Sequence, residues 1–168
     1  GKSLAAKTIH ANGEQFEESF FSIDCSTASQ DLLEAELFGN KAHNQPGLLQ
    51  IADGRTVYLK EISAMSKTAQ IMLRNHLDKE NGNLAPRIIV GSSNPLEPLV
   101  KSKNFDSALF FKINVNPISI ASLRERADDS ILIACYLLKK SQKRLQKIGL
   151  ELSQDTKVAI REYDWPGN

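Results

Sequence analysis

Cysteine is scarce in this sequence: Cys25 and Cys135 are the two cysteines among 168 residues. Each lies in an apolar run, which predicts reduced thiols inside the core of a cytoplasmic protein. A disulfide or a reactive thiol is the alternative that the sequence leaves open. The three histidines, His10, His43 and His76, lie far apart without the spacing of metal ligands, so no zinc site is expected.

Long apolar runs are also missing, and so is an excess of charge of one sign. No stretch approaches the roughly 18–20 apolar residues that cross a bilayer, and the start shows no secretory signal, so we expect no membrane partner. The net charge of +1 by itself requires no nucleic acid, membrane or acidic substrate as a partner. Hydrophobic residues make up 41% of the chain, enough for one domain, or for one domain with a small appendix.

Buried strands alternate with amphipathic helices over the first two thirds of the chain. The strands are apolar on both faces, a pattern typical of a parallel sheet covered by helices. The polar, turn-forming stretch 39–47 is predicted to be a loop. We expect helices over 3–11, 30–38 (capped by Ser29) and 65–77, and strands over 20–25, 56–59, 87–90 and 110–115.

From about residue 118 the pattern is helical only. Asp128 and Asp129 place negative charge at a helix start. We therefore predict two parts, an α/β core over residues 1–116 and a helical appendix over residues 117–168. An apolar face at helical spacing supports the appendix: Ile131, Ala134, Cys135 and Leu138.

The chain opens on Gly1-Lys2-Ser3, at the head of the first predicted helix. This triplet fits the end of a phosphate-binding loop, in which backbone N–H groups and the helix N-terminus hold phosphate. The lysine would neutralise the phosphate, and the serine hydroxyl would bind magnesium. Three residues alone are weak support, and an ordinary helix start is the alternative. Because a domain seldom begins inside such a loop, and the chain closes on Trp165-Pro166-Gly167-Asn168, we expect a fragment of a longer protein.

Longer segments of the chain resemble the sigma-54-dependent transcription activators, also called bacterial enhancer-binding proteins, and they occur in the same order. GKSLAAKTIH resembles the family's GKELVARAIH, and SFFSIDCSTASQDLLEAELFG resembles PFVAVNCAALPEELLESELFG. ADGRTVYLKEI resembles ADGGTLFLDEI, RIIVGSSNPLEPLV resembles RIIAATNRDLEELV, and KINVNPISIASLRERADD resembles RLNVFPIRLPPLRERRED. The terminal YDWPGN matches the segment before the family's sensor arginine. These matches cover nearly the whole chain.

The resemblance implies an AAA+ ATPase domain, that is, a P-loop NTPase with a three-layer α/β sandwich, a parallel sheet and a small α-helical lid. In the family such domains form rings, usually of six, and hydrolyse ATP to remodel RNA polymerase held closed by sigma-54. A receiver or sensing domain lies upstream, and a helix-turn-helix DNA-binding domain lies downstream. The resemblance assigns Gly1, Lys2, Ser3, Ser93 and Arg124 to nucleotide binding. For Arg124, as for Arg126, an ion pair with Asp128, Asp129 or another neighbour is the alternative.

The acidic pair that the family needs for hydrolysis is altered. The family has Asp-Glu, where the aspartate helps to hold magnesium and the glutamate polarises the attacking water; here the pair is Lys60-Glu61. Lys60 would repel the metal and would itself neutralise a phosphate, or it would extend to solvent from the strand end. Glu61 is the catalytic remnant. The family's asparagine that positions this glutamate, the switch position, is Asp24, and the sensor position is Ser93.

The arginines that reach the neighbouring subunit's γ-phosphate in the family are also replaced. Asp106 stands at the first arginine-finger position and Lys112 at the second. An aspartate opposes a phosphate, and a lysine lacks the planar fork of arginine. Such arginines are worth on the order of a thousandfold in rate, so we expect ATP hydrolysis to be weak or absent.

Two surface loops are shorter than in the family. ELFG is followed by NKAHNQPGLLQIADG, without the GAFTGA segment that touches sigma-54, and the loop between MLRNHL and RII is short as well. Losing both is consistent with a protein that no longer contacts sigma-54. Loops that are omitted from the sequence are the alternative explanation.

We therefore predict the central AAA+ domain of a bacterial transcription regulator, a nucleotide-binding or ligand-responsive module that assembles as a dimer or a hexameric ring. The expected ligands are ATP or ADP, with magnesium binding weakened, and cyclic di-GMP by family analogy. The expected partners are further copies of the chain, RNA polymerase, and DNA through the downstream helix-turn-helix domain. Two alternatives stay open: an active ATPase that remodels sigma-54 polymerase, and a structural oligomerisation module with an empty pocket.

Overall fold

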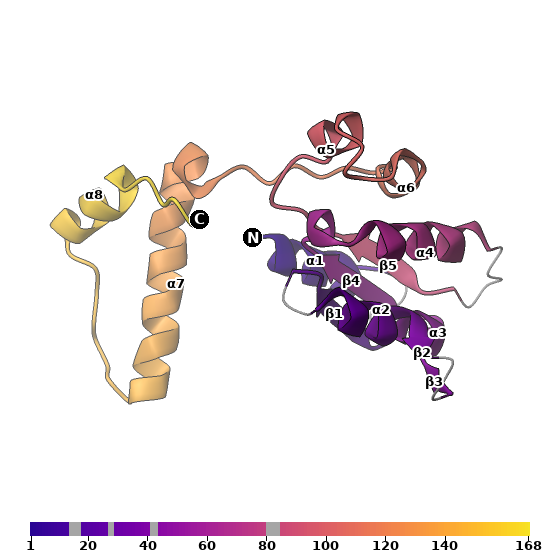
Figure 1. Ribbon diagram of the computed structural model, residues 1–168. Coiled ribbons are helices and arrows are strands. Elements are labelled where there is room, and N and C mark those ends of the chain that lie inside the picture. Colours follow the sequence, from indigo (N-terminus) through magenta and orange to yellow (C-terminus); the bar gives the residue numbers. More distant parts are fainter. Residues whose placement is uncertain (14–17, 27–28, 41–43, 80–84) are drawn as a thin grey trace. The chain divides into compact units, whose positions relative to one another are not determined.

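The computed structural model describes residues 1–13, 18–26, 29–40, 44–79 and 85–168. The chain divides into two compact units, Gly1–Ile118 and Ser119–Asn168, whose elements are labelled in Figure 1. The first unit holds a sheet with helices, and the second is helical, as predicted. Among the described residues, no helix is long and apolar enough to cross a membrane.

A three-stranded parallel sheet organises the first unit. Its strands are β1 (Phe20–Asp24), β4 (Thr56–Lys60) and β5 (Arg87–Val90), in the order β1-β4-β5, so β4 is central. Phe20 of β1 pairs with Thr56 of β4, and Thr56 pairs with Arg87 of β5. Because the strands are parallel and start level, the residues that follow them meet at one edge. The predicted parallel sheet is confirmed, and so are its first three strands.

One face of β4 builds the main hydrophobic core. Side chains alternate between faces along a strand, and the face with Val57 and Leu59 is covered by α2 (Gln30–Phe38) and α4 (Lys67–Asp78). Ser29 caps α2 as predicted, because its hydroxyl accepts a hydrogen bond from the amide of Leu32. The core contains these buried side chains: Ile23, Cys25, Leu33, Leu37, Leu49, Ala52, Val57, Leu59, Ile62, Met65, Ala69, Leu73, Phe105 and Leu109.

The opposite face of β4 carries Thr56, Tyr58 and Lys60, and it faces α1 (Lys2–Ala11). A buried hydrogen bond of 2.9 Å joins Nδ1 of His10, near the end of α1, to Oγ1 of Thr56 at the start of β4. The last turn of α1 therefore lies over the start of β4, and its first turn lies near the end of the strand. With helices on both faces of the sheet, the predicted three-layer sandwich is confirmed.

A tight hairpin lies within the stretch predicted as a loop. β2 (Gly39–Asn40) pairs antiparallel with β3 (Gln45–Pro46), and four residues connect them. Gly39 has a φ of 86°, and a Cβ on Gly47 would lie 2.3 Å from the Gly39 nitrogen, so both positions require glycine. Two-residue strands leave no alternation in the sequence. Three short helical segments without a sequence signal complete this unit's connections: α3 (Leu48–Ile51), η2 (Ile62–Ala64) and α5 (Glu97–Lys101).

The strand predicted over residues 110–115 is wrong. This segment begins inside α6 (Ser107–Ile113), whose N-cap Asp106 accepts a hydrogen bond from the amide of Leu109 at 2.7 Å. Leu109 is buried, whereas Phe111 is 74% exposed. The apolar run therefore has one buried face at helical spacing, and the capping aspartate was the signal that distinguishes it from a strand.

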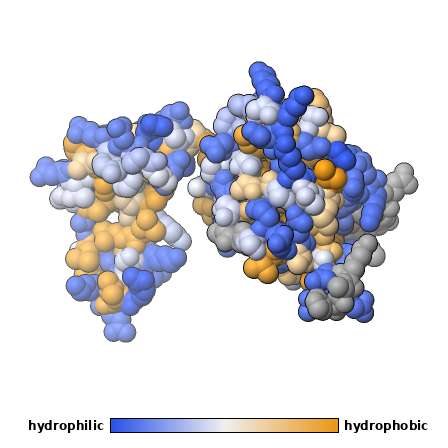
Figure 2. Space-filling model, viewed as in Figure 1, coloured by the Kyte–Doolittle hydropathy of each residue, from blue (hydrophilic) through white to orange (hydrophobic). Residues whose placement is uncertain are grey.

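The second unit consists of η3 (Leu123–Arg126), α7 (Ala127–Leu145) and α8 (Gln154–Glu162). Its predicted apolar face is half-buried on α7, and the two predicted aspartates stand in the first turn. Asn168 Oδ1 accepts a hydrogen bond from the amide of Leu123 at 2.6 Å. Figure 2 shows apolar surface on this unit as well. The exposed apolar side chains of α7 include Leu132, Ile133 and Leu137.

Gly91, just after β5, allows the close approach of Tyr58. A Cβ at Gly91 would lie 2.6 Å from Oη of Tyr58, whose ring is buried. We expect Gly91→Ala to lower the free energy of unfolding by about 1–3 kcal/mol through overpacking, as measured by urea denaturation. Tyr58→Phe in the same chain should recover part of that loss. Gly167→Ala is the control, because a Cβ there meets open space, and equal stability of Gly91→Ala and the unmodified chain would contradict the packing.

Candidate functional site

The carboxyl edge of the sheet collects the polar residues around the start of α1. Lys2 lies in the first turn of α1, and its Nζ donates to Oγ of Ser93 at 2.7 Å. The same Nζ lies 3.2 Å from Oε1 of Glu61. Gly1 provides no side-chain cap, so the backbone N–H groups of the first turn retain their partial positive charge. Gly1 and Ser3 are both exposed.

Glu61 is held in one position directly after β4. Its backbone is left-handed, with φ 50° and ψ 49°. The amide of Ser93 donates to Oε2 at 2.9 Å, and the Ser93 hydroxyl donates to Oε1 at 2.7 Å. Partial burial raises the pKa of Glu61, but the hydrogen bonds from Ser93 and the contact with Lys2 outweigh it, so the pKa lies below its ordinary value. The carboxylate is therefore ionised and a weakened base.

Lys60 and Asp24 occupy the ends of neighbouring strands. They are register partners across β4 and β1, and Lys60 is half-buried. The pKa of Asp24 is lowered first by the Ser26 hydroxyl, then by the Ser26 amide, with a further contribution from the charge of Lys60. Both Ser26 groups donate to Oδ1, at 2.6 and 3.0 Å. The edge thus holds two ammonium groups and two ionised carboxylates.

Two other predicted site residues of the first unit, Asp106 and Lys112, lie outside this edge, and Arg124 belongs to the second unit. Asp106 caps α6, and its carboxylate also pairs with Arg74 of α4 at 2.9 Å. Lys112 forms an ion pair with Asp78 at the end of α4. Arg124 lies in η3. The ion pair predicted for Arg124 or Arg126 is formed by Arg126, which lies 3.0 Å from Asp129.

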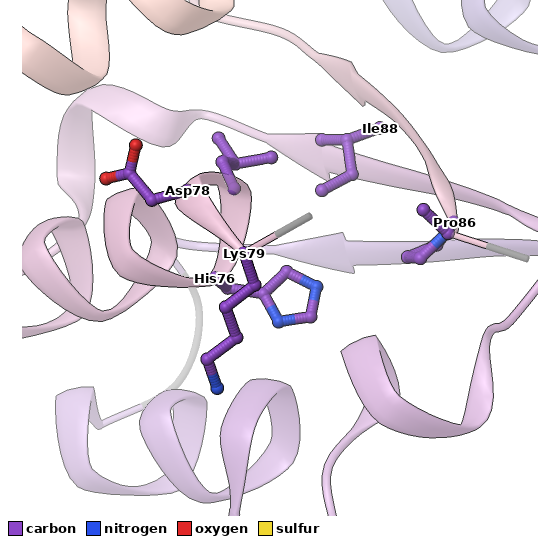
Figure 3. A pocket seen from close by; sticks show the side chains of 7 residues that line it. His76, Asp78, Lys79, Pro86 and Ile88 are labelled. Carbon is purple, nitrogen blue, oxygen red and sulfur yellow. The ribbon is translucent and has the colours of Figure 1, made fainter. Parts of the chain in front are cut away.

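A hollow of about 370 Å³ lies at the opposite end of β5. Figure 3 shows His76, Asp78 and Lys79 from the end of α4 beside Pro86 and Ile88. Burial lowers the pKa of His76, and the charge of Lys79 adds to this effect. No sequence motif marks this hollow. It is separate from the edge that carries Lys2 and Glu61, because it adjoins the start of β5 and not its end.

The fold of the chain is shared with solved bacterial regulators, one of which is described as a P-loop NTPase domain. NtrX of Brucella abortus in complex with ATP superimposes on the whole chain with a TM-score of 0.90 at 24% identity, over 41% of that protein. The P-loop NTPase domain of the sigma-54 transport activator from E. coli has a TM-score of 0.51 at 17% identity, covering 72% of this chain and 75% of that one. The α/β fold with a parallel sheet and a helical second part is therefore confirmed.

The chain belongs to the Sigma-54 interaction domain family, whose model matches residues 1–119. The transcriptional regulatory protein XylR of Pseudomonas putida is 31% identical over all of this chain and 32% of its own length. The Nif-specific regulatory protein of Enterobacter agglomerans is 33% identical over all of this chain and 35% of its own length. The chain thus spans about a third of these relatives. The XylR alignment has 184 positions for the 168 residues here, so 16 positions lack a counterpart.

Cys25 and Cys135 are both free cysteines, as predicted for reduced thiols. Cys25 is fully buried, and burial, followed by the charges of Asp24 and Glu61, raises its pKa to about 12. Because the thiolate is the nucleophile, we expect iodoacetamide at mildly alkaline pH to label half-buried Cys135 and to spare Cys25. Peptide mapping by mass spectrometry measures both sites. A guanidinium-unfolded sample is the control, and equal labelling of Cys25 with and without guanidinium would contradict its burial.

Asp106 should contribute to stability through its capping hydrogen bond. We expect Asp106→Ala to lower the free energy of unfolding by about 1–2 kcal/mol, as measured by urea denaturation. Asp106→Asn keeps a capping oxygen and loses the ion pair with Arg74, and partly exposed pairs contribute little, so its loss should be smaller. If Asn proves as damaging as Ala, the ion pair and not the cap is the main contribution.

Proposed function

We propose that this chain is the AAA+ domain of a bacterial transcription regulator that binds ATP or ADP at the start of α1 and hydrolyses ATP slowly or not at all. The observation that carries the proposal is the Lys2–Glu61–Ser93 contact at the carboxyl edge of the sheet. It combines the cation expected of a phosphate site with a glutamate whose two oxygens already accept hydrogen bonds.

Nucleotide binding is supported by the start of α1. A ten-residue helix without a side-chain cap or an acidic residue in its first turn favours an anion there, since backbone N–H groups and the helix dipole both attract negative charge. Lys2 adds an ammonium group at the same position. NtrX, a structural neighbour of the same fold, is described in complex with ATP and with ADP.

Impaired hydrolysis is supported by the state of Glu61 and by its neighbour Lys60. A general base acts best when its pKa lies near the working pH, whereas the pKa of Glu61 is lowered. Lys60 places a positive charge where catalysis by a metal would need a negative one. Asp106, the residue at the predicted arginine-finger position, is engaged within its own chain by α6 and Arg74.

Action without sigma-54 contact is supported by the hairpin after α2. Only four residues connect β2 and β3, so the connection is too short to carry the family's GAFTGA segment. The XylR alignment leaves 16 positions without a counterpart, which is a number of the size expected for two shortened loops. The regulator would act by self-assembly as a dimer or ring and through DNA bound by a downstream domain, with RNA polymerase as the remaining partner.

Calorimetry and phosphate release test the proposed function. We expect ATP and ADP to bind the unmodified chain, Lys2→Ala to weaken binding by about tenfold or more because it removes a phosphate cation, and phosphate release to stay at background. Lys7→Ala is the matched control, because Lys7 is exposed on the same helix. The same titration with cyclic di-GMP tests the ligand taken from family analogy.

Other outcomes identify the two rival functions. The presence of Glu61 at the end of β4 favours an active ATPase. If the unmodified chain hydrolyses ATP and Glu61→Gln abolishes that activity, the chain is an active ATPase and our proposal is wrong. Sigma-54-dependent transcription in vitro would then be its measured activity. The structural module would be established by two results together. No nucleotide would bind in calorimetry, and the particle size measured by light scattering would stay the same with and without nucleotide.

A further inference from the structure

Lys60 points toward the face of the sheet on which phosphate would bind. Thr56 and Lys60 lie on the same face of β4, because they are four residues apart in a strand. The Thr56 hydroxyl contacts His10 of α1, which identifies that face as the one covered by α1. Since α1 begins near the end of β4, where Lys2 meets Glu61, Lys60 lies at the level of the first turn of α1.

The residues at this edge do not fit a magnesium ion. Mg²⁺ takes oxygen ligands, commonly one or two carboxylates beside phosphate oxygens. Glu61 uses both oxygens as acceptors for Ser93 and Lys2, and Asp24 Oδ1 accepts twice from Ser26. The ammonium of Lys60 repels a divalent cation. Within the described ranges, no three His, Cys, Asp or Glu side chains form a group that could hold a metal.

We propose that this chain binds the phosphate groups of its nucleotide without a divalent cation, and that the ammonium of Lys60 supplies the positive charge in place of the metal. The inference rests on the proposed nucleotide binding at α1. Lys2 neutralises the phosphates from the helix, and Lys60 does so from the end of β4. A lysine ammonium is a compact point charge suited to phosphate. ATP therefore needs no magnesium to bind here, in contrast to the magnesium complex that nucleotide hydrolases use.

Isothermal calorimetry with ATP tests this inference in two buffers, one with EDTA and one with excess magnesium. For the full unmodified chain we expect dissociation constants that agree within about threefold, or a tighter one in EDTA. Lys60→Asp should bind about tenfold or more weakly in EDTA and recover with magnesium, because a carboxylate repels phosphate and attracts the metal. Lys103→Asp makes the same charge change at an exposed residue whose backbone is in the left-handed region. Its dissociation constants should equal those of the unmodified chain in both buffers.

The outcomes separate this inference from the function on which it rests. No ATP binding in either buffer removes the proposed nucleotide site itself. Binding that requires magnesium in the unmodified chain leaves nucleotide binding intact and overturns the role of Lys60. Lys60→Met keeps an apolar side chain of similar length without the charge. It replaces Lys60→Asp in the same calorimetry if Lys60→Asp does not fold. It should bind more weakly in both buffers, and affinity in EDTA equal to that of the unmodified chain would overturn the inference.

Discussion

Parallel hydrogen bonding along both edges of β4 is the constraint on which the rest of this structure depends. With β1 and β5 hydrogen-bonded in register on either side, both the position of β4 and the face on which each of its side chains lies are fixed. Alternation then directs Val57 and Leu59 into the core and Thr56 and Lys60 toward α1. The same register brings Asp24, Glu61 and Ser93 to one edge. A single strand therefore determines both the hydrophobic core and the polar site.

The polar edge balances its charges within the chain. Lys2 is paired with Glu61, and Lys60 lies beside Asp24 as its register partner. A polyanion that binds here interacts with lysines whose carboxylate partners are already in place. The phosphate affinity of such a site is the difference between the new contacts and the internal ones that they weaken.

Much of the fold and part of the site could be predicted from the sequence. Strands 20–24, 56–60 and 87–90 are short apolar runs bounded by polar residues, and the hydroxyl of Ser29 marks the start of α2. The segment after Asp106 resembles a strand because it contains two adjacent phenylalanines, whereas the capping aspartate before it indicates a helix. The hairpin was missed because its strands of two residues have no periodicity.

The site was predicted residue by residue but not as an arrangement. Lys2, Glu61 and Ser93 could each be identified from local motifs, yet their contact depends on how α1, β4 and β5 end at one edge. The partners of Asp106 were not foreseen, because Arg74 and Gln70 are 32 and 36 residues away in the chain. A local pattern identifies the residue type, whereas the tertiary fold decides which group it meets.

The base of the hairpin at Gly39 and Gly47 has a consequence for how this chain can vary. The two backbones approach so closely that neither position accepts a side chain, and the two described base pairs, Gly39–Pro46 and Asn40–Gln45, close the hairpin. Descendants of this gene must therefore inherit both glycines unchanged, because any side chain at either position would push α2 away from the segment that leads into α3.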